Sequence, residues 1–196
     1  MSRSAEISRS TGETDITVSL TLDGSGAGTR ATGVGFFDHM LDALARHGGL
    51  DLEVEANGDL GTGSHHTVED VGIVIGQALD EALSDRAGIT RFGHAVVPMD
   101  DARASAAIDV SGRVFVAVEG EPIPSRTIGG FETELVEEFL RAVASNAKLT
   151  VHVTVERGRD PHHMVEASFK AFARALRQAV SLDPDVSGIP STKGLL

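Results

Sequence analysis

Cysteine, tryptophan and tyrosine are all absent from this sequence of 196 residues. Without cysteine there can be no disulfide, no thiolate nucleophile and no thiolate metal ligand, which fits a reducing compartment and predicts a cytoplasmic location. Aromatic stacking can come only from the eight phenylalanines or from histidine. No apolar run approaches about 18 residues, and residues 1–10 have no apolar signal core, so we expect neither a membrane span nor a targeting segment.

Basic residues are also few in this sequence. The chain has 17 Lys and Arg residues against 29 Asp and Glu residues, a net charge of −12 with neutral histidine. This balance argues against a nucleic-acid partner or a membrane-surface partner, because both attract basic proteins. An anionic substrate is compatible with it only if arginine and lysine side chains cluster locally.

Two copies of one motif are present, at His65-His66-x-x-Glu69 and at His162-His163-x-x-Glu166. The residues around the two copies repeat as well. Each copy opens a stretch with apolar residues at spacings of three and four, which indicates an amphipathic helix, and each follows a short alternating strand. Further upstream, residues 39–45 can be superposed on residues 138–144, which indicates a second amphipathic helix in each half.

The predicted element order of each half is therefore β-β-β-α-β-α. We predict an α+β fold in which two sheets sandwich a four-helix layer. It is built from half-repeats at 1–87 and 88–196, the second with a C-terminal tail, and both form one compact domain. Turn signals separate the predicted strands, which are residues 5–10, 14–22, 28–32 and 52–56 in the first half and 93–98, 102–109, 113–118 and 149–153 in the second.

The spacing within the motif suits chelation at the start of a helix. At about 100° per residue, His65 and Glu69 lie roughly 40° apart around the helix axis, so they can bind one ion. His66 lies about 100° from His65, and we expect adjacent histidines to serve different metals. The second copy has the same geometry, and Pro161 before it marks a helix start. Taken singly, each motif could also be a surface helix start at which glutamate favours the helix dipole.

Histidine and carboxylate ligands without cysteine suit a first-row divalent ion, and manganese, iron, zinc and cobalt all qualify. His39 is a further candidate ligand, because it opens the earlier helix of the first half and the repeat pairs it with Glu138. Glu138 could equally be a solvated surface residue. His47 could cap the end of its helix, but we favour contact with substrate because its repeat partner, Asn146, is a poor ligand.

Four segments together resemble the motifs of a known enzyme family, the imidazoleglycerol-phosphate dehydratases. The resemblance covers essentially the whole chain, and its motifs are long, ordered and correctly spaced. The segments are Gly35-Phe36-Phe37-Asp38-His39-Met40-Leu41, His65-His66-Thr67-Val68-Glu69-Asp70, the stretch from His162 to Ala171, and Ser191-Thr192-Lys193-Gly194.

The resemblance implies that imidazoleglycerol phosphate is converted to imidazole acetol phosphate and water, a step of histidine biosynthesis. It also implies two manganese ions per active site, placed where the subunits of a 24-mer homo-oligomer meet. Many family members have histidine at the position of Glu138, and the family often has glutamine at the position of Ala43. The implied metal ligands are His39, His65, His66, Glu69, His162, His163 and Glu166, with Glu138 as an added candidate.

The resemblance further assigns residues to a small phosphorylated imidazole substrate. Glu13 matches a family position that contacts substrate, and we predict it as an acid/base catalyst together with Glu69 and Glu166. The arginine and lysine residues would clamp the phosphate, although each could also be an ordinary surface charge. The predicted substrate-binding set is Glu13, His39, His47, Arg91, Arg113, Lys170, Ser191 and Lys193, of which the tail residues are expected to order only on binding.

Two metals suit this reaction for a chemical reason. The departing proton lies on a carbon with no neighbouring carbonyl to acidify it, so a side-chain base alone would face a high barrier. An imidazole ring held between two metals as an imidazolate could expel the adjacent hydroxide and form a diazafulvene. The diazafulvene would acidify the neighbouring proton enough for a carboxylate to remove it.

Two other functions compete with this one on the sequence alone. A dinuclear metallohydrolase of a phosphorylated small molecule would also use two metals and a phosphate clamp. A metal-binding carboxylate bundle is the non-enzyme alternative. Such bundles carry Glu-x-x-His within helices, whereas this chain has His-x-x-Glu at helix starts.

Overall fold

The computed structural model describes residues 3–196, and its two halves contain the same series of elements. The first half comprises β1 (Ser4–Ser10), β2 (Thr14–Thr21), β3 (Arg30–Ala31), α1 (Gly35–Gly48), β4 (Asp51–Gly58) and α2 (His65–Leu83). The second half comprises β5 (Phe92–Met99), β6 (Ala102–Asp109), β7 (Phe115–Gly120), α3 (Leu135–Ala147), β10 (Thr150–Arg157) and α4 (Pro161–Val180). The predicted duplication of a β-β-β-α-β-α unit is confirmed.

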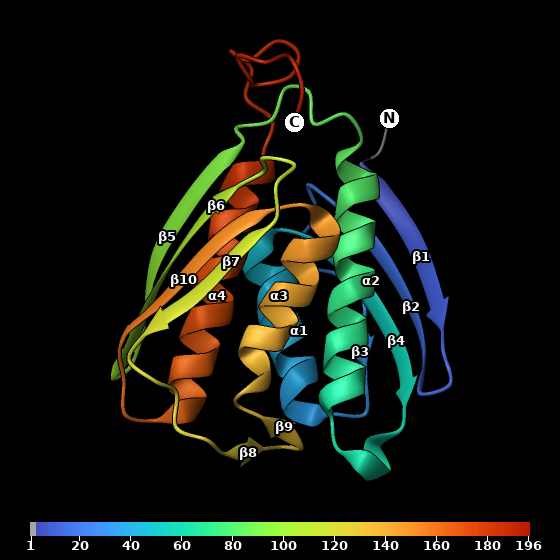
Figure 1. The fold of residues 1–196 in the computed structure, drawn as a ribbon, viewed down its shortest axis with the longest axis vertical. Helices are drawn as coiled ribbons and strands as arrows, with labels where there is room; N and C mark the ends of the chain where they lie inside the picture. The colour runs from blue at the N-terminus through green and yellow to red at the C-terminus, as the bar shows by residue number, and fades with distance from the viewer. Residues whose placement is uncertain (1–2) are drawn as a thin grey trace.

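The two sheets also share one topology. Their spatial orders are β1-β2-β4-β3 and β5-β6-β10-β7, so in each the fourth strand of the half lies between the second and the third. The third strand runs parallel to the fourth, and the other neighbours are antiparallel. Figure 1 shows the sheets on the two outer sides with the four helices between them, as predicted.

Alternation along the strands explains why each sheet has one buried face. In β2, Ile16, Val18 and Leu20 are buried against the helices, while the residues between them are more exposed. Val18 pairs with Val54 of β4, which continues the same apolar row across the sheet. Because successive side chains point to opposite faces of a strand, this pattern fixes which face receives the helices.

A series of phenylalanine rings joins the helices of the two halves. Phe37 of α1 lies 5.4 Å from Phe139 of α3, and Phe139 lies 5.1 Å from Phe169 of α4, between ring centroids. All three rings are fully buried. The hydrophobic core is one cluster that draws residues from both halves, so neither half has a separate core. With no tryptophan or tyrosine, these rings supply the largest apolar areas available.

The structure also departs from the sequence-based expectations in its connections. A short hairpin, β8 (Thr127–Ile128) and β9 (Phe131–Glu132), precedes α3, and a 3₁₀ turn at Leu60–Thr62 precedes α2; neither was predicted. The third strands were predicted inaccurately, because β3 spans only two residues and β7 begins at Phe115. Among the described residues, no helix is both long enough and apolar enough to cross a membrane.

Close contact between α2 and α3 depends on two glycines of α2. A Cβ built on Gly76 would lie 2.6 Å from the carbonyl oxygen of Val143 and 2.7 Å from the Cβ of Asn146. A Cβ on Gly72 would lie 2.8 Å from the Cβ of Ala142. The absence of side chains at these two positions lets the backbones of the helices approach.

We predict that Gly76→Ala destabilises the fold by about 1–2 kcal/mol, because overpacking outweighs the better helix propensity of alanine. The midpoint of denaturant unfolding, measured at one protein concentration, checks this. Gly12→Ala is the control, since no atom lies within 4 Å of a Cβ built there. Equal midpoints for the two variants would show that α2 and α3 separate without cost.

Candidate metal centre

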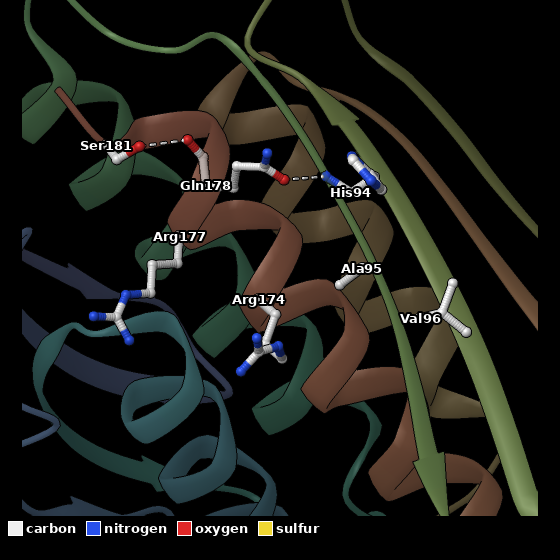
Figure 2. Close-up of a pocket in the computed structure, with 7 residues that line it drawn as sticks. All are labelled: His94, Ala95, Val96, Arg174, Arg177, Gln178 and Ser181. Carbon is white, nitrogen blue, oxygen red and sulfur yellow. Dashed lines mark hydrogen bonds between the residues drawn. The ribbon is translucent and has the colours of Figure 1, made fainter. Parts of the chain in front are cut away.

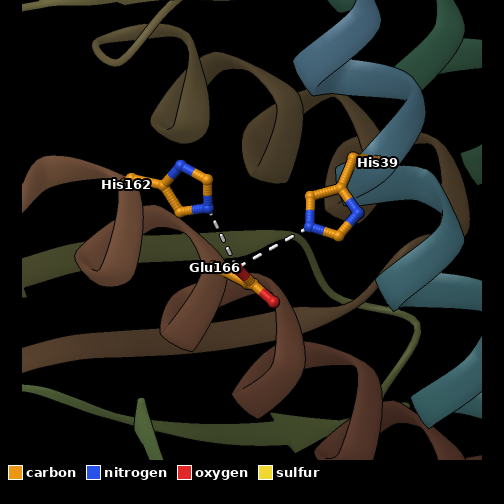
Figure 3. Close-up of side chains that lie close together, drawn as sticks. All are labelled: His39, His162 and Glu166. Carbon is orange, nitrogen blue, oxygen red and sulfur yellow. Dashed lines mark ion pairs between the residues drawn. The ribbon is translucent and has the colours of Figure 1, made fainter. Parts of the chain in front are cut away.

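Three potential metal ligands converge at the start of α4. His162 and Glu166 come from its first turns, one helical turn apart, and His39 comes from α1 beside it (Figure 3). The Nε2 atom of His162 lies 3.3 Å from Oε2 of Glu166, and Nε2 of His39 lies 3.7 Å from the same oxygen. Among the described residues, this is the group of three or more His, Cys, Asp or Glu side chains whose ligand atoms all lie within 4.8 Å of one another.

Glu166 is the centre of this group and is 6% exposed. Burial alone would raise its pKa, but the Lys170 ammonium, with His39 and His162, holds the pKa below its ordinary value. Lys170 Nζ lies 2.7 Å from Oε1, so the other carboxylate oxygen is the one that faces the two imidazoles. The carboxylate is therefore charged, with one oxygen paired and one directed to the histidines. Phe36, 4.8 Å from His162 between ring centroids, packs against that imidazole.

The first-half motif forms a smaller group at the start of α2. Nε2 of His65 lies 3.7 Å from Oε2 of Glu69, as expected for residues one turn apart, and both side chains are about half exposed. Glu138 is half-buried in the first turn of α3. It joins no group of three potential ligands within the described chain. The two motifs thus give unequal ligand sets, despite their equal spacing.

The second histidine of each motif turns to a carboxylate from a loop. Nδ1 of His66 lies 3.0 Å from Asp59, and Nδ1 of His163 lies 2.6 Å from Asp101. These hydrogen bonds raise the pKa of each histidine and lower that of each aspartate. A carboxylate can only accept, so each Nδ1 carries the proton. The Nε2 of His163 lies 3.4 Å from Oδ2 of a second aspartate, Asp100.

Neither aspartate was singled out from the sequence. Asp101 sits in the turn between β5 and β6, 62 residues before its histidine, and no local pattern signals that contact. Asp59 directly follows β4 and lies seven residues before His66, within the loop that leads into α2. The one available signal is that a histidine which binds metal usually donates its other nitrogen to an acceptor.

Glu13, which was predicted as an acid/base catalyst, lies near the first-half motif. Its carboxylate approaches Nδ1 of His66 to 3.8 Å, and its backbone carbonyl accepts a hydrogen bond from the Asp59 amide. The side chain is 57% exposed. Asp100 and Asp101 occupy the corresponding turn of the second half, beside His163.

Four of the five residues predicted to bind the phosphate, which are Arg91, Arg113, Ser191 and Lys193, lie far from these groups in a single copy of the chain. The Arg91 amide donates to the carbonyl of Ala179, near the end of α4, which is about 25 Å along the helix axis from His162. Arg91 also pairs with Asp109 and donates to the Pro190 carbonyl, so it holds the start of the tail. Arg113 is largely exposed beside Asp109, and Ser191 and Lys193 follow in the exposed tail.

Two predicted substrate residues lie nearer the three-ligand group. Lys170 contacts Glu166 directly. His47, in the last turn of α1, has a pKa lowered by burial and by the nearby charges of Lys170 and Arg174. The structure therefore divides the eight predicted substrate residues among distant parts of one chain. A single copy does not bring Arg91, Arg113 and the tail to the histidine groups.

The donor chemistry of the three-ligand group fits a divalent metal ion. Two imidazole nitrogens and one charged carboxylate oxygen suit first-row metals, and the absence of cysteine disfavours soft-metal sites. The loop aspartates behind His66 and His163 match the arrangement that orients histidine ligands elsewhere. The residues present therefore suit a metal-dependent enzyme.

Comparison with known proteins agrees with this geometry. The family model described as imidazoleglycerol-phosphate dehydratase matches residues 32–176. A relative from Granulibacter bethesdensis with that name is 57% identical over 197 residues, covering 100% of both chains. The crystal structure of the enzyme from Staphylococcus aureus has a TM-score of 0.83 and 40% identity, covering 92% of this chain and 99% of that one. The structure from Pyrococcus furiosus has a TM-score of 0.83 and 37% identity, covering 97% and 100%. The chain therefore belongs to the imidazoleglycerol-phosphate dehydratase family of hydro-lyases.

Proposed function

We propose that the chain dehydrates imidazoleglycerol phosphate to imidazole acetol phosphate, in the cytoplasm, at a metal site shared between copies. The observation that carries this proposal is the group of His39, His162 and Glu166, where two imidazoles face one charged carboxylate oxygen. Family membership supports the substrate and the reaction. A side-chain base alone cannot activate the substrate's imidazole ring. A metal ion held by this group would supply that activation.

We assign two manganese ions to each active site. One would be held by the three-ligand group and the other by His65 and Glu69, and the diverging His66 and His163 would complete the two sets. Glu138, which the repeat pairs with His39, is assigned as a further ligand. The ligand types alone would also suit iron, zinc or cobalt. When bound, the metals supply Lewis-acid activation of the substrate imidazole, which the proposed imidazolate and diazafulvene route requires.

The residues of the chain have separate tasks in the proposed reaction. Elimination removes the hydroxyl from the carbon next to the ring and a proton from the following carbon, leaving an enol that becomes the ketone. We assign Glu13 to accept or return a proton beside the substrate ring, and its exposure and its distance of 3.8 Å from His66 support this role. Glu166 is held charged by Lys170, and Glu69 is its counterpart in the first motif.

Separation of Arg91, Arg113 and the tail residues from the histidine groups supports a shared site. Within one copy, Arg91 lies about 25 Å along α4 from His162. That distance is too long for one substrate molecule to contact both places. We therefore infer that Arg91, Arg113, Ser191 and Lys193 of one copy serve the metal groups of others. The 24-mer that the family resemblance implies is the proposed assembly.

Glu166→Gln is expected to lower metal affinity and dehydratase turnover by about 100-fold or more, because it removes the charged centre of the ligand group. Calorimetric titration with Mn²⁺ measures the first effect, and ketone formation from imidazoleglycerol phosphate the second. Glu137→Gln, on the surface of α3, is the control. Release of inorganic phosphate in place of ketone by the wild-type protein would indicate a hydrolase instead.

Asp101→Asn and Asp59→Asn are each expected to weaken Mn²⁺ binding by about 10-fold to 100-fold, because a neutral amide oxygen replaces the charged acceptor that orients His163 or His66. Asp15→Asn, on an exposed strand position, removes the same charge without touching either histidine. Metal affinity is the readout, with circular dichroism to confirm folding. Equal affinity in all three variants would rule out an orienting role for these carboxylates.

Two inactive variants, Glu166→Gln and Arg113→Gln, are expected to restore each other when co-expressed. If each site takes its metal group and its clamp from different copies, random mixing leaves roughly a quarter of sites intact. Turnover of the purified mixed oligomer is compared with each variant alone. Activity no higher than that of the separate variants would show that one copy supplies both parts.

A further inference from the structure

A groove with two unpaired arginines runs along the C-terminal half of α4. Its volume is about 460 Å³, and it is lined by Arg174, Arg177 and Gln178 of α4, by Ser181, and by residues 94–96 of β5. Figure 2 shows both guanidinium groups extending from α4 on the same side of the helix. Gln178 closes the opposite side, where its side-chain oxygen accepts a hydrogen bond from the His94 amide.

Among residues 3–196, the two arginines have no acidic partner. Within the described chain, neither Arg174 nor Arg177 forms an ion pair or a hydrogen bond, and both are exposed. This is unexpected in a chain whose acidic residues outnumber its basic ones by 29 to 17. Arg177 lies over Gly49, at the end of α1, where a Cβ would come within 3.1 Å of its Nε. That contact positions the guanidinium, and no carboxylate of the described residues pairs with it.

The repeat shows that the fold itself does not require these charges. The positions of α2 that correspond to Arg174 and Arg177 are Gln77 and Asp80, by the same offset that relates the two His-His motifs. Asp80 is paired there with Arg86 and Lys148. The equivalent helix in an equivalent layer is therefore stable without a basic face. The arginines of α4 need an explanation other than packing.

Their position relates them to the metal group. Glu166, Lys170 and Arg174 succeed one another at intervals of four residues, so they form a row on one face of α4. The charges of Lys170 and Arg174 also reach His47, whose pKa they lower together with burial. Arg174 lies about 12 Å along the axis from Glu166. An anion attached by a short carbon chain to a ring at Glu166 would meet Lys170 first and Arg174 next.

We propose that Arg174, supported by Arg177, binds the phosphate monoester of the substrate in this groove. The inference rests on the proposed function, since it takes the ring of the same molecule to be held at the metal group. Guanidinium groups suit this ligand, because they donate two parallel hydrogen bonds to phosphate oxygens and stay charged at every physiological pH. In the shared site, Arg91 and Arg113 of one copy would contact the phosphate. Arg174 would add a contact from the second copy, which holds the metal.

Arg174→Gln in the Mn²⁺-loaded oligomer is expected to raise KM for imidazoleglycerol phosphate about tenfold, as for the loss of one charge-assisted hydrogen bond. Turnover at saturation should change less than about twofold, because the residue does not touch the reacting carbons. The affinity of the variant for inorganic phosphate should fall in parallel. Calorimetric titration and inhibition of turnover both measure this affinity. Arg177→Gln should show a smaller effect in the same direction.

Arg141→Gln is the matched control, because it removes the same charge from an exposed position on α3. If Arg174→Gln changes KM and phosphate affinity no more than Arg141→Gln, the groove does not bind phosphate. A fall in turnover at unchanged KM would also overturn the proposal. An altered oligomer size in gel filtration would assign the groove to contact with a second copy. Phosphate titration does not need turnover, so a wild-type protein inactive towards imidazoleglycerol phosphate would refute the proposed function separately.

Discussion

Adjacent side chains at the start of a helix diverge by about 100°, and the arrangement of this protein follows from that constraint. His162 turns towards Glu166, one turn along α4, while His163 turns to Asp101 in a loop. The same division occurs in α2, where His65 faces Glu69 and His66 faces Asp59. A His-His pair in this setting therefore supplies ligands to two places, and completing either place requires side chains from elsewhere.

Duplication provides the scaffold for these places, and divergence makes them unequal. Both halves set a His-His-x-x-Glu motif at the start of the helix that packs on their own sheet. Only α1 adds a histidine to the neighbouring motif, because the corresponding position of α3 is Glu138. The buried Asp70, which accepts from Thr14 and pairs with Arg9, has Ala167 as its counterpart. One half thus anchors its motif through a salt bridge to the sheet, and the other through apolar packing.

Much of the fold could be predicted from the sequence, because the spacing of apolar residues indicates most of its helices and strands. Alternation in residues 14–22 and the three-and-four spacing after His65 and His162 each reflect one buried face, and the repeat doubled every signal. The ligand pairs within one helical turn followed from the same geometry. The β8–β9 hairpin carries too few residues to show any period, and the contacts of Asp59 and Asp101 depend on how loops fold over helix starts. Local patterns hold no information on such tertiary contacts.

The position of the predicted phosphate-binding arginines is a second feature that local sequence patterns could not predict. Arg91 and Arg113 were assigned by resemblance, and nothing in the chain's periodicity places them relative to His162. Only the tertiary structure shows how far Arg91 lies from His162. Hydrogen bonds between Thr90 and Ser181 hold Arg91 at the far end of α4. A site divided between copies leaves no trace in the pattern of one copy.

The ring of Phe36 beside His162 has a practical consequence. A chain without tryptophan and tyrosine absorbs and emits very little light in the near ultraviolet, so the folded protein is almost dark to fluorescence. A single indole put in place of this phenylalanine, 4.8 Å from the imidazole between ring centroids, would be the sole strong emitter in the molecule. The chemistry at the start of α4 could then be followed optically, without any background from the rest of the chain.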